Sequence, residues 1–319
     1  MNTIIIDGLS YALPLLIIGI GGIFSERSGV TNLALEGLLG FGAFTGGLFV
    51  TLVNRFLGLD DMLTFYLSFV AAALGGAAFS LLHALLCIKF RANQVISGVV
   101  INIAAMALTG FLAMLVNQAI AGSASNKFLL TTAPRYSVPA LKDIPILGGF
   151  FTNIYPFELI IIALAAIFWF ILYRSRFGLH VMACGDNPQA VDAAGINVAR
   201  VRMVAVSISG LLSGVGGMCF AYSISANVSP AIYVGAGYLA IAAMIFGNWK
   251  IVPTLAACLI FGFARSAAYQ LVLYLKIGSM VTDLAMTIPY ILVLVLLIFF
   301  SKRNRAPRAL GQIYDKGQR

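Results

Sequence analysis

The sequence predicts an all-α membrane protein, and three observations support this fold class. First, 61% of the 319 residues are hydrophobic and 10% are charged, which gives a mean hydropathy of +0.99. Second, windows of about 20 apolar residues recur along the chain, and this is the length that a helix needs to cross a bilayer. Third, the sequence lacks the short alternating segments of β-barrel strands. We therefore expect a polytopic bundle of transmembrane helices.

Apolar spans follow one another along the chain, separated by short polar stretches. They cover residues 3–24, 30–53, 62–88, 95–121, 155–173, 200–222, 234–248, 251–275 and 283–300. The span 234–248 is short and is compatible with a re-entrant or broken helix, so we expect about nine crossings, with a range of roughly eight to ten. Residues 1–300 are thus predicted to form one transmembrane domain, followed by a basic tail over residues 301–319.

The basic residues are distributed unequally between the two sides that these crossings define. With the tail in the cytoplasm, fourteen lie on the inner side: Arg27, Lys89, Arg91, Arg174, Arg176, Arg200, Arg202, Lys250, Lys302, Arg303, Arg305, Arg308, Lys316 and Arg319. Five lie on the outer side: Arg55, Lys127, Arg135, Lys142 and Lys276. By the positive-inside rule we expect a cytoplasmic C-terminus and an outer N-terminus. This pattern also accounts for the net charge of +9 without a nucleic-acid partner. The loop 122–154 is then on the outer side, bent by Pro134, Pro139 and Pro145.

The sequence carries no motif of a catalytic subunit. It has no Gly-Lys dipeptide, so it lacks an ATPase-type phosphate-binding loop, and it has no Gly-x-Ser-x-Gly elbow. His83 and His180 form no paired metal-binding motif, and we expect no metal site. The four cysteines lie in or beside apolar spans and are expected to serve packing: Cys87, Cys184, Cys219 and Cys258. Because no Lys or Arg precedes the first apolar run, a cleaved signal peptide is not expected.

The polar stretch 174–199 contains the signals of a short helix. Asn187 suits the N-cap, Pro188 suits the first helical position, and Gly195 suits a left-handed C-terminal cap. Residues 188–194 would form about two turns, too short to cross a bilayer. Local features alone leave two interpretations open, an ordinary interfacial helix or a docking element for a cytoplasmic partner.

Two glycine-rich apolar segments, 28–42 and 235–248, each precede a long span. Matching broken segments in the two halves of a transporter indicate a substrate path, but glycines also permit close helix packing. Glu36 in the first segment is expected to share a helix face with Asn32. Its favoured role is to hydrogen-bond a neighbouring helix, with substrate contact as the alternative. The other ionisable residues inside or near the ends of spans are His83, Glu158, Arg265 and Asp283. We expect His83 to be packed and hydrogen-bonded, and Arg265 to snorkel or bridge helices.

Several segments resemble those of membrane permease subunits of bacterial ABC importers. They are residues 24–37, 93–98 with Asn102, 178–179, 185–188, 193–196, 237–242 and 246–249. The likeness is greatest to nucleoside permeases, within a wider family that also serves simple sugars and branched-chain amino acids. It covers nearly the whole chain and leaves out the outer loop and the tail.

The resemblance implies an ABC importer permease fold in the bacterial plasma membrane. Two homologous permeases, commonly non-identical, would assemble with two ATPase subunits and receive substrate from an external binding lipoprotein. ATP and Mg²⁺ would be bound by the ATPase, so this chain needs no cofactor and is not itself an enzyme. The short cytoplasmic helix would seat in a groove of the ATPase. The residues expected to couple the two subunits are Asp186, Asn187, Pro188, Gln189, Ala190, Val191, Asp192, Ala193, Ala194 and Gly195.

The resemblance further implies a path that passes a flat base and ribose hydroxyls without holding them tightly. Residues with amide, carboxyl or aromatic side chains are candidates for it: Asn32, Glu36, Phe41, Phe44, Asn93, Asn102, Tyr238 and Asn248. Simple sugars or branched-chain amino acids are the alternative substrates. An ATPase-independent secondary transporter would need an ion relay in the membrane, which the sparse carboxylates disfavour, and a membrane enzyme would need clustered catalytic residues.

Overall fold

The computed structural model describes residues 2–131, 133–140, 149, 151–230, 235–275, 287–300 and 305–315. In this part of the chain, seven helices are long and apolar enough to cross a membrane. Their α-helical portions are α1 (Asn2–Arg27), α2 (Leu35–Phe56), α3 (Asp61–Ala84), α4 (Gln94–Ala121), α5 (Pro156–Arg174), α8 (Val198–Phe220) and α10 (Ile251–Leu275). These helices confirm the predicted all-α class and correspond to seven of the expected spans.

Shorter elements connect or extend the long helices. The π-helical turns η1 (Leu85–Lys89) and η3 (Ala221–Ser225) continue α3 and α8. The others are α6 (Arg176–Asp186), α7 (Pro188–Ala193), α9 (Ala236–Phe246), α12 (Ile288–Phe300), β1 (Phe128–Leu129) and β2 (Asn227–Val228). The two strands form an antiparallel pair with Phe128 opposite Val228.

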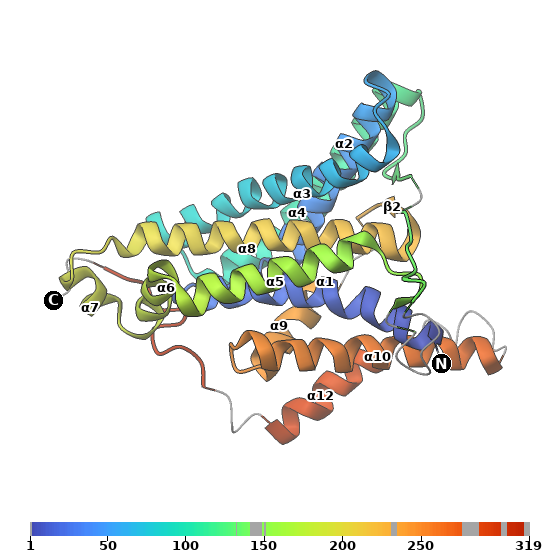
Figure 1. Ribbon diagram of the computed structural model, residues 1–319. Coiled ribbons are helices and arrows are strands. Elements are labelled where there is room, and N and C mark those ends of the chain that lie inside the picture. Colours follow the sequence, from blue (N-terminus) through green and yellow to red (C-terminus); the bar gives the residue numbers. More distant parts are fainter. Residues whose placement is uncertain are drawn as a thin grey trace.

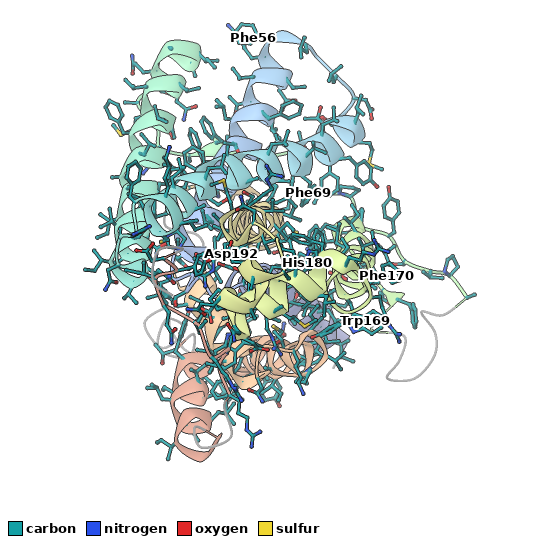
Figure 2. The ribbon with its side chains drawn as sticks, turned by 90° about the vertical axis from the view of Figure 1, so that its left-hand side faces the viewer. Phe56, Phe69, Trp169, Phe170, His180 and Asp192 are labelled. Carbon is teal, nitrogen blue, oxygen red and sulfur yellow. The ribbon has the colours of Figure 1, made fainter. Side chains whose placement is uncertain are left out.

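The long helices form a bundle whose two ends differ (Figure 1). The β end carries β1, β2 and the start of α1. The α7 end carries α6, α7 and the described part of the tail, residues 305–315. Side chains of the outer helices, such as Trp169 and Phe170 of α5, point away from the bundle (Figure 2). Phe170 is 59% exposed, as an apolar side chain facing lipid would be.

α8 lies at the centre of the bundle, between α3 on one side and α1 on the other (Figure 2). Small residues make this close packing possible. A Cβ on Gly42 of α2 would lie 2.2 Å from the Cα of Gly214 in α8. A Cβ on Gly76 of α3 would lie 2.2 Å from the carbonyl oxygen of Gly210. Glycine is therefore required where these membrane helices cross.

The expected span 234–248 contains a helix of 11 residues, α9, whose length of about 16 Å cannot cross a hydrocarbon core of about 30 Å. The chain nevertheless passes from β2 at the β end to Trp249 at the α7 end, where the Trp249 carbonyl accepts a hydrogen bond from Arg27 Nε (3.1 Å). The described part of this span thus contains one short helix, as expected for a re-entrant or broken segment. Of the last expected span, α12 covers the described part, and Asp283 lies outside the described residues.

Candidate functional site

α7 has the capped structure that its sequence predicts. Asn187 Oδ1 accepts a hydrogen bond from the Ala190 N–H (3.0 Å), and Pro188 occupies the first helical position. Gly195 is left-handed (φ +81°), and the Ile196 N–H donates to the Val191 carbonyl (3.2 Å), as in a Schellman motif. The helix ends at Ala193, one residue earlier than expected, because these bonds form its C-terminal cap.

The two faces of α7 differ in exposure and size. Pro188 and Val191 are buried against the bundle, whereas the remaining side chains face outward or lie at the edge. The exposed residues of the predicted coupling set are Asp186, Asn187, Gln189, Ala190, Ala193, Ala194 and Gly195, and Asp192 is half-buried. The outward face is therefore dominated by small side chains, which allow another protein surface to approach closely.

α6 precedes α7 and was not expected from the sequence. Val181 and Cys184 are buried, and Phe177 is half-buried beside them. Their spacing of four and three residues is the apolar periodicity of an amphipathic helix, and it is the signal that could have predicted α6. Burial raises the pKa of the Cys184 thiol to about 11. The thiol is therefore protonated at neutral pH and serves packing.

The tail segment, residues 305–315, is bound to the α7 end through its backbone. The Ala309 N–H donates to the Gly185 carbonyl at the end of α6 (2.7 Å). Two residues later, the Gly311 N–H donates to the Gly29 carbonyl, just after α1 (3.1 Å). The tail segment thus links the helix pair α6–α7 to the turn between α1 and α2.

Two arginines fix the same segment with different degrees of burial. Arg202 of α8 is 4% exposed, and it donates from Nε to the Ser28 carbonyl (3.0 Å) and from Nη1 to the Gln312 carbonyl (3.3 Å). Arg91 is 51% exposed and donates to both carboxylate oxygens of Asp315 (2.8 and 2.9 Å). The buried arginine therefore joins α8, the turn after α1 and the tail segment at one point.

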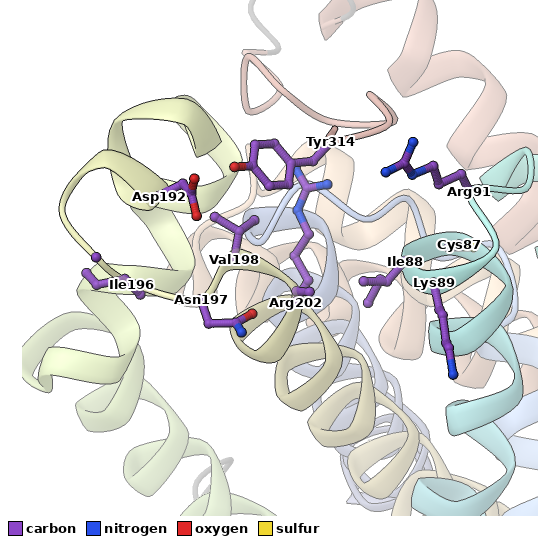
Figure 3. Close-up of a pocket in the computed structure, with 12 residues that line it drawn as sticks. Cys87, Ile88, Lys89, Arg91, Asp192, Ile196, Asn197, Val198, Arg202 and Tyr314 are labelled. Atoms are coloured by element: carbon purple, nitrogen blue, oxygen red, sulfur yellow. The ribbon is translucent and has the colours of Figure 1, made fainter. Parts of the chain in front are cut away.

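A pocket of about 470 Å³ opens at the α7 end (Figure 3). Asp192, Ile196 and Asn197 border it on one side, Lys89 and Arg91 on the other. The remaining lining residues are Cys87, Ile88, Gly195, Val198, Ala199, Arg202 and Tyr314. The exposed end of α7 and the basic end of η1 thus face the same hollow.

In the middle of the bundle, the first turns of α2 and α9 meet. Glu36 Oε1 accepts a hydrogen bond from the Gly235 N–H and Oε2 accepts one from the Gly237 N–H, both 2.5 Å long. The carboxyl group thereby satisfies backbone donors at the start of α9 that have no partner within the helix. The structure thus shows the neighbouring-helix role that the sequence favours for Glu36.

Asn102 of α4 completes this contact. Its Oδ1 accepts from the Gly37 N–H (2.7 Å), and its Nδ2 donates to the Leu33 carbonyl (2.8 Å) and to the Tyr238 hydroxyl (2.9 Å). Tyr238 is 47% exposed, so its ring leaves the bundle beside Asn102. We call Glu36, Asn102, Gly235, Gly237 and Tyr238 the central junction.

The expectation that Asn32 and Glu36 share a helix face is wrong. α2 begins at Leu35, so Asn32 precedes the helix. Its Oδ1 accepts from the Ala34 N–H (3.1 Å), a local turn that competes with helix formation. Its Nδ2 donates to Ser209 Oγ (2.9 Å), and the side chain is fully buried.

The other predicted path residues are distributed over the bundle. Phe41 stacks on Phe79 with ring centroids 4.2 Å apart, and Phe44 is buried in the core. Asn93 caps the start of α4, and Asn248 accepts a hydrogen bond from the tail segment; both lie towards the α7 end. The structure therefore brings Glu36, Asn102 and Tyr238 together and separates the rest. Substrate contact stays a prediction for all eight residues.

A second pocket, of about 320 Å³, lies towards the β end, and we call it the β-end pocket. It is lined by Asp7, Ser10, Tyr11, Arg135, Tyr155, Ser223, Ile224, Arg265, Ser266 and Tyr269. Arg265 bridges α10 to α1, because its Cζ lies 4.1 Å from the centre of the Tyr11 ring. Bridging helices was one of the two roles expected for this residue. From the sequence, Arg265 was expected to act inside a span, but its grouping with residues of α1, η3 and the segment around Tyr155 was not.

Residues 4–299 match the family model described as branched-chain amino acid transport system, permease component. The chain belongs to this family of membrane permeases. With its long apolar helices, this membership makes the chain a multi-pass membrane protein.

Relatives within the family carry names that concern nucleosides. The guanosine ABC transporter permease protein NupQ of Bacillus subtilis is 41% identical, over all of this chain and 98% of the relative. The nucleoside ABC transporter permease protein NupC of Lactococcus lactis is 36% identical, with the same coverage. Among solved structures, an inward-facing ABC transporter assigned to the metal-chelate type is similar in fold (TM-score 0.50, 16% identity, 93% of this chain and 85% of the other).

Proposed function

We propose that this chain is a permease subunit of an ATP-driven ABC importer that moves nucleosides inward across the bacterial plasma membrane. The observation that carries the proposal is similarity over the whole chain to permeases named for guanosine and for nucleosides, at 41% and 36% identity. Simple sugars and branched-chain amino acids are the competing substrates.

The α7 end is the cytoplasmic side in this proposal, and residues 186–195 dock on a separate ATPase subunit that binds ATP and Mg²⁺. Three features support this assignment. α7 is capped at both ends, its outward face carries three exposed alanines beside polar side chains, and the basic end of η1 borders the same pocket. The chain itself contributes docking and a path, and hydrolysis belongs to the partner.

In this proposal, movement of the ATPase is transmitted to the middle of the membrane through a series of hydrogen-bonded contacts. α7 follows α6, whose Gly185 binds Ala309 of the tail segment. The tail segment binds Gly29, which precedes α2, and Glu36 in the first turn of α2 holds α9. A displacement of α7 therefore shifts the central junction, where Asn102 and the exposed Tyr238 line one wall of the path. A second, different permease covers this exposed side and completes the path.

At the β end, the outer side in this proposal, an external binding lipoprotein delivers the substrate. The described part of the loop 122–154 is held there by the β1–β2 pair and by a bridge between Tyr136 and Ile154. This end therefore offers a folded surface of loops and strands for docking.

The decisive test is binding-protein-dependent uptake of labelled guanosine, uridine, ribose and leucine in cells with and without this chain. We expect uptake of the nucleosides to depend on the chain. Uptake of ribose or leucine without uptake of nucleosides would show that the substrate is a sugar or a branched-chain amino acid instead. Co-purification of an ATPase subunit separates the proposal from a secondary transporter, which would work without one.

A further inference from the structure

The β-end pocket is assembled from elements that are distant in sequence. α1 contributes Asp7, Ser10 and Tyr11, and α10 contributes Arg265, Ser266 and Tyr269. The remaining walls come from the residues around Tyr155 and from η3. Its volume of about 320 Å³ falls within the usual range for small-molecule sites. The pocket is thus large enough for one small organic molecule.

Charged side chains of both signs surround this pocket. Arg135 and Arg265 line it, as does Asp7, and Glu158 lies directly behind Ser10, whose Oγ donates to its carboxyl group (2.7 Å). Side chains of both signs therefore line the pocket, and the two arginines are already engaged with the rings of Tyr155 and Tyr11. The pocket therefore suits a neutral ligand with both donors and acceptors of hydrogen bonds.

Ser266 provides an independent sign of a ligand. Its side chain is 5% exposed and lines the pocket, yet its Oγ has no hydrogen-bond partner among the described residues. A buried hydroxyl without a partner costs about 1–3 kcal/mol. A polar group of a ligand in the pocket would remove this cost.

Aromatic rings line the same space and continue towards the central junction. Tyr269 is 39% exposed and presents a ring on which a planar base can stack, whereas the rings of Tyr11 and Tyr155 are covered by Arg265 and Arg135. Tyr11 is hydrogen-bonded to Tyr290 of α12, whose hydroxyl lies against Gly235 at the start of α9. The pocket is thus connected through polar side chains to the residues that Glu36 holds.

We propose that the β-end pocket is the outer binding site for the transported nucleoside, occupied after release from the binding lipoprotein and before passage along the central junction. The base stacks on Tyr269, and a ribose hydroxyl or base nitrogen bonds to Ser266. This inference rests on the proposed function and adds a site to it.

The test compares two serines whose hydroxyls are both buried and without a partner among the described residues, Ser266 and Ser213. Ser213 lies in α8 and lines none of the pockets described above. The assembled transporter is purified with Ser266→Ala or Ser213→Ala, and binding of tritiated guanosine is measured in the absence of binding protein. Loss of one hydrogen bond should weaken binding about tenfold in Ser266→Ala, with Ser213→Ala unchanged.

Photolabelling locates the site directly. 8-Azidoguanosine should label peptides that contain Ile224 or Tyr269, and excess guanosine should suppress the labelling while excess ribose should not. Equal binding by both serine variants, labelling elsewhere, or equal competition by ribose would overturn the inference. If the wild-type transporter takes up guanosine in any of these cases, the inference alone fails. If it takes up no nucleoside, the proposed function fails.

Discussion

Glu36 and Gly237 are 201 positions apart in the sequence, and a hydrogen bond of 2.5 Å joins their side chain and backbone in the middle of the bundle. A Cβ on Gly237 would lie 2.5 Å from the backbone nitrogen of Glu36, so glycine is required for this approach. In hydrocarbon, backbone N–H groups at a helix start need a partner within the protein. The carboxyl group of Glu36 supplies it, which allows α9 to begin inside the membrane.

Replacing Glu36 by Ala should destabilise the transporter, because two backbone donors at the start of α9 lose their partner. We expect a loss of about 3 kcal/mol, seen as a lower thermal midpoint of the purified complex, together with loss of uptake. Glu36→Gln, which keeps one acceptor oxygen, should retain part of the stability. If Glu36→Ala melts like the wild type but transports nothing, substrate contact is the main role of Glu36.

Gly195→Val should uncouple transport from ATP hydrolysis. A β-branched residue is strained at φ +81°, so the chain leaving α7 is redirected and the docked surface changes. Gly58, with φ +57° and open space around it, is the matched control at the β end. In reconstituted complexes, Gly195→Val and the bulky Ala193→Trp should abolish uptake and binding-protein-stimulated ATP hydrolysis, without preventing membrane insertion. Gly58→Val should preserve both activities. Normal coupling in the Gly195 and Ala193 variants would make α7 an interfacial spacer.

Arg202→Ala and Arg91→Ala should differ strongly, although both residues contact the tail segment. Arg202 is buried, and its removal leaves the carbonyls of Ser28 and Gln312 without a donor, at a cost of about 2–3 kcal/mol. The Arg91–Asp315 pair is partly exposed, and such pairs contribute at most about 1 kcal/mol. Thermal midpoints and uptake per ATP hydrolysed are the measurements. Equal effects would show that the tail segment does not depend on the buried contact.

Cysteine labelling tests the orientation of the bundle. All four native cysteines are buried, so the background should be low. A cysteine at exposed Ser123 should react with an impermeant maleimide in intact cells, and one at exposed Gln312 should react only after lysis. The reverse pattern would invert the proposed topology.

The long helices, the caps of α7 and the short apolar segment before α10 could all be predicted from the sequence. These features depend on local composition: apolar runs long enough for a bilayer, Asn187 and Gly195 at helix ends, and a short span flanked by glycines. α6 was missed because its apolar positions Phe177, Val181 and Cys184 are embedded in a stretch read only for its basic residues. The start of α2 was placed too early because Asn32 forms its own turn.

Only the tertiary structure decided which of these segments touch. The sequence determined that Glu36 is an ionisable group in an apolar segment, which needs a partner. That its partners are Gly235 and Gly237 depends on how α2 and α9 cross. The bonds of Ala309 to Gly185 and of Gly311 to Gly29 are made by backbone groups, which every residue has, so no side-chain pattern encodes them. The β-end pocket exists for the same reason, since its polar side chains become neighbours only when α1, α10, η3 and the residues Arg135 and Tyr155 pack together.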